Sequence, residues 1–421
     1  MRGLQRRALV SIGSAVSLAA LLLLAPATAA NADLVRDREY WLADYGIRAA
    51  WQQTRGAGVT VAVIDTGIDG THPDLVGAVS GGTDFSGDGS RTGQEPVGTE
   101  DASHGTMVAS LLAGRGRGGG IDGSAGIIGV APEASLLSIS IGFGDKARHS
   151  DDQIADAVVW AVDHDADVIN MSLTRNTPDW PRSWDVAFQY AMDHEVVIVA
   201  AAGNRGSGTE AVGAPATMPG VLTVAGLDRA GSASDNASAQ GITIGVAAPS
   251  EQLVGAVPGT GYVTWSGTSG AAPLVAGVVA LVRAAHPDLD AASVINRITS
   301  TATDAGARGV DPIYGFGTLH ADRAVSAKVA KVQVNPMGDL AEWVRVHRRA
   351  SADPQPLATI APPSGARVES ATPVPVAPET LPVSAVRGVL VPGALALVFA
   401  AAAAVLVTGA RRHFGGLRRR E

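Results

Sequence analysis

The sequence contains no cysteine, and this absence excludes several classes of protein at once. Without thiols there can be no disulfide scaffold, no cysteine nucleophile and no thiolate metal site. Charge is also sparse, since 17% of the 421 residues are charged and the formal net charge is -8. A nucleic-acid-binding protein needs a basic face, so we expect no nucleic-acid partner. The hydrophobic fraction of 46% is too high for a disordered chain and can fill the core of a large domain.

The first 29 residues have the pattern of a secretory signal peptide. Residues 1–7 form a basic start, an apolar run follows from Ala8 to Ala25, and Ala27–Ala29 has the A-x-A spacing of a cleavage site. These parts in this order predict a signal peptide over residues 1–29. The alternative is a first transmembrane helix, which the A-x-A close and the serine and glycine residues in the run disfavour.

A second apolar run, residues 388–410, contains no ionisable side chain. As a helix it would measure about 34 Å, enough to cross a hydrocarbon core of about 30 Å. Arginines follow at once in the tail 411–421, so the positive-inside rule places this tail in the cytoplasm. We therefore predict a single-pass cell-membrane protein whose body lies outside the cell. The alternative is a cell-wall sorting signal, but Ser384 and Ala385 stand where that signal has threonine and glycine.

The region between these two runs divides by composition. Eight prolines lie between Pro354 and Pro382, among Ala, Val and Ser and with no helical period. Such a composition favours an extended, semi-rigid spacer. We predict an N-terminal extension over residues 30–55, a globular domain over 56–330 and a proline-rich linker over 331–386.

The globular domain has alternating strand and helix patterns. Val59–Ile64 is a continuous β-branched, apolar run, which is typical of a strand buried on both faces. Residues 151–165 have the spacing of an amphipathic helix, with Asp151 and Asp152 as cap candidates. Further strands are expected at 135–141, 168–173, 196–202 and 221–226, and further helices at 105–113 and 270–285. This alternation predicts an α/β fold, a doubly wound and mostly parallel sheet with helices on both faces.

Polar residues follow the strand ends or begin the helices, where such folds gather their reactive groups. Asp65 and Asn204 end strands, whereas His104 and Ser269 begin helices. Each residue alone is explained equally well by a structural role, as a cap, a solvated histidine or a turn. Asp65-Thr66-Gly67 also suggests an aspartic protease, but that mechanism needs a second such carboxylate and the chain has none after an apolar strand.

The order of these residues distinguishes the alternatives. Asp65, His104 and Ser269 follow one another as the triad does in subtilisin, unlike the orders in chymotrypsin and the α/β-hydrolases. Ser269 would be the nucleophile, His104 the general base and Asp65 the residue that orients the imidazole. Asn204 would stabilise the oxyanion. The mechanism needs no cofactor, and because the Asp-rich segment 84–88 lacks an EF-hand register we predict no metal site.

The chain resembles the subtilisin-like serine proteases over about residues 40–325. The motifs that carry the resemblance are Val63–Asp69, His72–Leu75, His104–Thr106, Gly129–Pro132, Ala202–Asn204, Gly267–Ser269 and Tyr314–Leu319. The resemblance implies a protein or peptide substrate and substrate contacts at Ser172, Leu173, Thr174 and Gly203. Thr174 stands where subtilisins usually have glycine, so it would narrow the subsites if this strand aligns with the substrate. Gly270 and Leu274 stand where many of these proteases have Met and His.

Within that family the chain resembles the mycosins, membrane-anchored proteases of the type VII secretion system. The segment Arg36–Leu42 leading to Trp51, and the order of signal peptide, protease, linker, span and basic tail, carry this resemblance. Only about 35 residues separate Ala30 from Asp65, which we expect to be too few for a folded pro-domain. Some mycosins carry disulfides, which this chain cannot form. The resemblance implies subunits of that secretion complex as partners. Two functions stay open: proteolysis of a secreted substrate, or a structural role in the secretion complex with proteolysis secondary.

Overall fold

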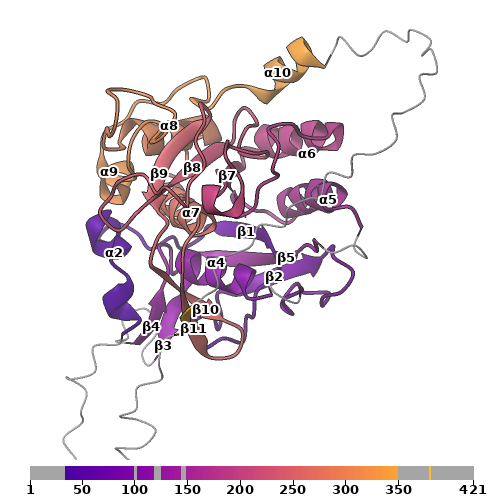
Figure 1. Cartoon of the computed structure of the whole chain (residues 1–421), viewed down its shortest axis with the longest axis vertical. Coiled ribbons are helices and arrows are strands. Elements are labelled where there is room, and N and C mark those ends of the chain that lie inside the picture. The colour runs from indigo at the N-terminus through magenta and orange to yellow at the C-terminus, as the bar shows by residue number, and fades with distance from the viewer. Residues whose placement is uncertain (1–33, 99–101, 118–124, 144–147, 349–378, 381–421) are drawn as a thin grey trace, which may run out of the picture. The chain divides into compact units, whose positions relative to one another are not determined.

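The computed structural model describes residues 34–98, 102–117, 125–143, 148–348 and 379–380 (Figure 1). The chain divides after Pro378 into two units, and the described part of the second is the short strand β12 (Glu379–Thr380). The predicted signal peptide (1–29), membrane span (388–410) and tail (411–421) lie outside the described residues. All the other described elements belong to the first unit.

The first unit is built on a seven-stranded sheet in which every pair of neighbours is parallel. The strand order is β2-β5-β1-β6-β7-β8-β9. The strands are β1 (Thr60–Asp65), β2 (Val79–Asp84), β5 (Ser135–Ser140), β6 (Val168–Met171), β7 (Val197–Ala201), β8 (Leu222–Leu227) and β9 (Ile244–Pro249). The five strands expected from the sequence are confirmed, with ends that differ by one or two residues. After β1 the chain forms the edge strand β2 and then β5, which lies between β2 and β1. From β6 onward the strands are added on the other side of β1, so the sheet has a topological switch point beside β1.

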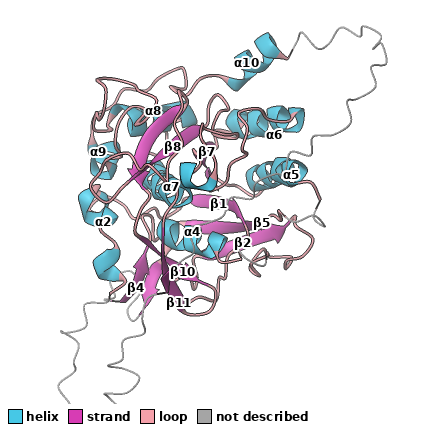
Figure 2. Ribbon diagram, viewed as in Figure 1, coloured by secondary structure: helices cyan, strands magenta, loops and turns pink. Residues whose placement is uncertain are grey.

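Helices cover both faces of the sheet (Figure 2). On one face lie α4 (His104–Ala113), α7 (Thr268–Ala285) and α8 (Ala291–Ser300), with α9 (Ala321–Ser326) packed against α7. On the other face α5 (Ser150–Asp163) and α6 (Arg182–Asp193) lie side by side. The expected α/β fold with a mostly parallel sheet and helices on both faces is therefore confirmed.

Two antiparallel hairpins extend from the sheet. One joins β3 (Arg115–Arg117) to β4 (Ala125–Ile128), and the other joins β10 (Leu253–Val257) to β11 (Gly261–Trp265). Strand β10 packs against α4, and β11 runs directly into the loop before α7. The second hairpin thus packs against α4, which begins at His104, and leads into α7, which carries Ser269 in its first turn.

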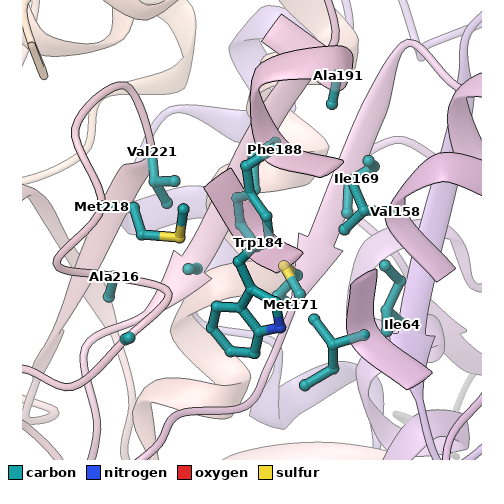
Figure 3. Close-up of a cluster of buried hydrophobic side chains, with 14 of the residues drawn as sticks. Ile64, Val158, Ile169, Met171, Trp184, Phe188, Ala191, Ala216, Met218 and Val221 are labelled. Carbon is teal, nitrogen blue, oxygen red and sulfur yellow. The ribbon is translucent and has the colours of Figure 1, made fainter. Parts of the chain in front are cut away.

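The core beneath α5 and α6 combines a few large side chains with many small ones (Figure 3). Trp184 and Phe188 from α6 are fully buried and stack on each other, with ring centroids 5.5 Å apart. They pack over Ile64, Ile169 and other strand residues. The indole Nε1 of Trp184 donates a hydrogen bond of 2.8 Å to the carbonyl of Asp151, so its polar atom is satisfied inside the core.

Helix α7 is apolar all round because it is buried on nearly every side. It is the one helix of the described residues that is long and apolar enough to cross a membrane, and 78% of it is buried inside the domain. Gly277 lets it approach its neighbours closely, since a Cβ there would lie 2.5 Å from the Cβ of Val130. Its hydropathy therefore reflects a core position and not a membrane span.

The N-terminal extension is folded onto the domain through η1 (Arg36–Arg38), α2 (Trp41–Asp44) and α3 (Ile47–Ala50). The indole of Trp51 donates to the carbonyl of Val130 at 2.8 Å, and Ala321 donates to the carbonyl of Tyr45 at 2.9 Å. Residues 34–55 are thus part of the folded body.

Two expectations from the sequence are wrong. Helix α5 is capped by His149, whose Nδ1 accepts from the amide of Asp151, so Asp151 and Asp152 lie in the first turn and not at the cap. The linker does not begin at residue 331, because α10 (Leu340–His347) packs against α6. Asp339 caps α10, and the ring of Trp343 lies 4.4 Å from that of Trp180. The described fold continues to Arg348, and the proline-rich part beyond it stays a prediction.

Candidate active site

A cleft of about 350 Å³ lies where β1, β6 and β7 end. This position agrees with the rule that ligands bind at the carboxyl ends of parallel strands, near a switch point. All eight residues predicted for the site line this cleft: Asp65, His104, Ser172, Leu173, Thr174, Gly203, Asn204 and Ser269. They come from segments far apart in the sequence, and the sheet brings them together.

Asp65 and His104 form the closest polar pair in the cleft. Asp65 is the last residue of β1, His104 is the first residue of α4, and Nδ1 of the imidazole lies 2.8 and 2.9 Å from the two carboxylate oxygens. The carboxylate also accepts a hydrogen bond of 2.7 Å from the amide of Thr66. The carboxylate is 3% exposed and so is shielded from water, and its pairing with Nδ1 fixes the orientation of the ring.

Thr66 connects the strand end to the helix start. Its Oγ1 accepts a hydrogen bond from the amide of Gly105 at 3.0 Å and lies 3.3 Å from Oδ1 of Asp65. It therefore holds Asp65 and the first turn of α4 in register. The sequence placed Thr66 inside a motif without assigning it a role.

Ser269 lies in the first turn of α7, opposite the end of β6. Its hydroxyl donates to the carbonyl of Ser172 at 3.0 Å, and the hydroxyl of Ser172 donates to the carbonyl of Ser269 at 2.8 Å. Pro273 explains this exchange, because it lacks the amide that would otherwise bond to the carbonyl of Ser269 within the helix. The proline thus leaves an acceptor that Ser172 satisfies, and strand β6 is tied to the start of α7.

The side-chain amide of Asn204 is oriented by Thr268. Its Oδ1 accepts from the amide of Thr268 at 2.8 Å and from the hydroxyl at 3.0 Å. Since both hydrogen bonds require an acceptor, the oxygen faces Thr268 and Nδ2 remains as the donor toward the cleft. Gly267 leaves room for it, with φ of 148° and a hypothetical Cβ 3.2 Å from Nδ2.

Trp265 forms a wall beside the imidazole. Its ring meets that of His104 edge to face, with centroids 5.8 Å apart. The sequence pattern assigns Trp265 no role. The one signal that could have found it is that an aromatic residue stands four positions before Ser269.

Two threonines narrow the cleft beside Gly203. A Cβ at Gly203 would lie 2.5 Å from Cγ2 of Thr209 and 3.3 Å from Cγ2 of Thr174. Gly203 also has φ of 104°, which favours glycine. Thr209, whose hydroxyl donates to Asn176 at 2.8 Å, is a lining residue that the sequence did not suggest.

The acidic segment 84–88 has a local role. The carboxylate of Asp84 accepts from the hydroxyl of Ser86 at 2.5 Å and from the amide of Gly87 at 2.9 Å, which orders the turn. Within the described ranges no group of three or more His, Asp or Glu side chains is arranged to hold a metal ion.

The sequence profile of the subtilase family of peptidases matches residues 56–317, more than half of the chain. The chain belongs to the subtilase family of serine endopeptidases. It is 35% identical over 271 residues to subtilisin of Bacillus pumilus, a match that covers 64% of this chain and 91% of that protein. It is 37% identical over 306 residues to fervidolysin of Fervidobacterium pennivorans, covering 65% of this chain and 42% of fervidolysin. This member thus spans less than half the length of that relative.

Solved structures agree with this assignment and with the resemblance to mycosins. The crystal structure of fervidolysin has a TM-score of 0.62 and 29% identity, and the alignment covers 73% of this chain and 48% of that one. MycP1 with its N-terminal propeptide removed has a TM-score of 0.59 and 32% identity, covering 70% of this chain and 98% of that chain. A further MycP1 structure is described as coming from the ESX-1 type VII secretion system. Within its family, this subtilase is thus similar to the mycosin MycP1.

Proposed function

We propose that this subtilase hydrolyses peptide bonds through a triad of Asp65, His104 and Ser269. The observation that carries the proposal is the pairing of both oxygens of Asp65 with Nδ1 of His104, in the same cleft as Ser269. With Nδ1–H donating to the carboxylate, Nε2 of the neutral ring is left with its lone pair and can act as a base.

In the first step Oγ of Ser269 bonds to the carbonyl carbon of the substrate, and the hydroxyl proton passes to Nε2 of His104. The hydroxyl must first turn away from the carbonyl of Ser172, to which it donates here. The imidazolium then gives its proton to the leaving nitrogen as the C–N bond breaks, and Asp65 stabilises its charge. Water repeats the sequence on the acyl-enzyme and releases the second product.

The negative oxygen formed in this step would be stabilised by Nδ2 of Asn204 and by a backbone N–H at the start of α7. Such a donor contributes about 3–4 kcal/mol to transition-state stabilisation in peptidases of this class. Asn204 suits this role because Thr268 fixes its amide before the substrate arrives. Preorganised donors need no reorientation during the reaction.

The substrate would lie along Ser172–Thr174, with one side chain entering the space beside Gly203. The methyl groups of Thr174 and Thr209 narrow that space, so we expect small side chains to be preferred there. The preceding strand β6 is held to the nucleophile by the exchange between Ser172 and Ser269.

We also propose that the enzyme is anchored in the cell membrane with its catalytic domain outside. The sequence patterns at 1–29, 388–410 and 411–421 support this. The likeness to MycP1 from the ESX-1 type VII secretion system favours work beside such a secretion complex, on a secreted protein. External protease added to intact cells should remove the domain and leave a short protected fragment; full protection of the domain would contradict the topology.

The nucleophile is tested by Ser269→Ala. We expect labelling by a fluorophosphonate probe to disappear and kcat/KM on peptides to fall by about 10⁶, because the triad acts as a unit. Ser326→Ala, which changes an exposed serine at the end of α9, is the matched control and should keep both. Near-normal labelling of Ser269→Ala would refute the triad assignment.

A second candidate function is structural, as a stabilising part of the secretion complex. The same substitution separates the two, since Ser269→Ala removes the nucleophile and leaves the domain in place. Secretion that persists in this variant and fails in a full deletion would mean that the presence of the domain supports transport. Equal failure of both strains would mean that proteolysis itself is needed.

A further inference from the structure

The cleft contains a second carboxylate that the proposed mechanism does not use. Asp65, His104 and Glu251 are the lining residues with ionisable side chains. Both oxygens of Asp65 are engaged by His104. Glu251 forms no ion pair with an arginine, lysine or histidine of the described residues, and it is half-buried. It therefore adds to the cleft a carboxylate that no described cationic side chain pairs with.

Glu251 is held in place at its carboxylate and at its backbone. The hydroxyl of Ser234 donates to its Oε1 at 2.5 Å, and the same hydroxyl accepts from the amide of Ala237 at 2.7 Å, which fixes the direction of the first hydrogen bond. The backbone carbonyl of Glu251 accepts from the hydroxyl of Tyr40 at 2.7 Å. Within the described part of the chain, Oε2 has no hydrogen-bond donor and remains available.

The backbone around Glu251 is tied to the segment that carries Ser269. The amide of Gly267 donates to the carbonyl of Ser250 at 2.7 Å, and the amide of Gln252 donates to the hydroxyl of Ser266 at 3.2 Å. Gln252 has φ of 53°, a left-handed conformation that is uncommon for a residue with a side chain. Such conformations persist where the surroundings over-determine them, frequently at functional sites.

We propose that Glu251 selects substrates that carry lysine or arginine on the leaving-group side of the scissile bond. The inference rests on the proposed peptidase function. Ser172–Thr174 would hold the substrate chain that precedes the scissile bond. The chain that follows it would then pass over residues 265–267, which line the same cleft and are hydrogen-bonded to the backbone around Glu251. A half-buried carboxylate in a cleft attracts a cation more strongly than an exposed one, because water screens it less.

The test compares three peptides that differ in one position after the scissile bond, where they carry lysine, glutamine or glutamate. For the unmodified protein we expect kcat/KM to fall in that order, by about fivefold to tenfold between the first and the last, the range of a partly screened ion pair. Glu251→Gln should remove the ranking and Glu251→Arg should reverse it. The ranking should also shrink as salt is raised from 50 mM to 500 mM.

Glu133→Gln is the matched control. Glu133 is exposed and precedes β5, at the amino end of the strands and away from the cleft, so its removal should leave the ranking unchanged. The same ranking in the unmodified protein and in Glu251→Gln, or no ranking at all in the unmodified protein, would overturn the proposal.

Binding measurements separate this proposal from the proposed function. The affinities of the three peptides for Ser269→Ala, with and without Glu251→Gln, report the ranking without turnover. If the unmodified protein hydrolyses nothing and resists the fluorophosphonate, the proposed function fails, yet a charge-ranked binding that Glu251→Gln abolishes would still support the role of Glu251. Hydrolysis and labelling without any charge ranking would overturn only the role of Glu251.

Discussion

On one face of the sheet α7 is built mostly from small residues, whereas on the other face α6 contributes large ones, and we call these the small-residue face and the large-residue face. Helix α7 buries glycine, alanine and valine on nearly every side, and α4 is buried along almost its whole length. Helices α5 and α6 are amphipathic, and α6 contributes Trp184 and Phe188 to the core. The outer side of α6 faces solvent, and Val186 on that side is 73% exposed.

The two faces also differ in what they contribute to the cleft. The small-residue face carries His104 and Ser269 at the starts of its helices, and the described residues of α5 and α6 contribute nothing to the lining of the cleft. Helices α4 and α7 pack against each other, and their first turns meet in one cleft. The large-residue face stabilises the fold by burying apolar surface. This stabilisation depends on the buried area, so the exact position of each side chain matters less than it does in the cleft.

The largest expected effect concerns Asp65, which ends β1 and pairs with His104 on the small-residue face. Asp65→Asn should lower kcat by about 10⁴ with little change in stability, because an amide neither holds the required tautomer of His104 nor stabilises its charged form. Asp163→Asn on α5, whose carboxylate accepts from the hydroxyl of Tyr190 at 2.8 Å, should leave kcat unchanged. Steady-state kinetics on a peptide substrate give both values. Comparable losses in the two variants would break the division between the faces.

On the large-residue face the expected loss is one of stability. Trp184→Ala should lower the free energy of unfolding by about 3–5 kcal/mol, since it empties a fully buried site. The activity per folded molecule, counted by fluorophosphonate titration, should stay close to that of the unmodified protein. Denaturant unfolding measures the first quantity. A fall in activity per labelled site of tenfold or more would show that this face positions the cleft after all.

Much of this arrangement could be predicted from the sequence, because it depends on local patterns. Continuous β-branched runs such as Val59–Ile64 have one stable place in such a fold, and the motifs around Asp65, His104 and Ser269 fix the chain order. The edge strand β2 (Val79–Asp84) was missed because it contains two glycines and is half-exposed. Thr209, Trp265 and Glu251 reach the cleft only through tertiary packing, which no local pattern reports. The cap of α5 was misplaced because histidine is an uncommon cap.

A smaller loss of stability is expected from overpacking on the small-residue face. Gly277→Ala should lower the free energy of unfolding by about 1–3 kcal/mol, because the new Cβ would meet Val130, although alanine favours helix formation by about 1 kcal/mol. Val186→Ala on the exposed side of α6 should change it by at most about 0.5 kcal/mol. Thermal or denaturant unfolding compares them. A stabilised Gly277→Ala would mean that α7 can move away from Val130 at little cost.

The smallest expected effect is a change in the pH dependence of stability. Burial holds the pKa of Glu39 well above its usual value, against the opposing effects of Arg36 and of the amide of Ile128. The folded protein therefore retains a proton that the unfolded chain loses first, and stability should fall as pH rises from about 4.5 through the folded pKa. Glu39→Gln cannot ionise, so its stability should fall less steeply over that range. Melting temperatures between pH 4 and pH 8 measure both slopes, and parallel slopes would contradict the assignment.

Helix α10 also determines how the domain would respond to force. Arg348 ends the described fold, with its Nε 2.9 Å from the carboxylate of Asp185 and its Nη2 donating to the carbonyl of Trp180 at 3.0 Å. Its guanidinium also lies 5.2 Å from the centre of the ring of Trp343. A pull on the chain beyond residue 348 would first load the contacts of Arg348 with Asp185 of α6 and with Trp180, which lie outside the sheet. If these contacts of Arg348 break first, α10 detaches from α6 and the cleft keeps its shape.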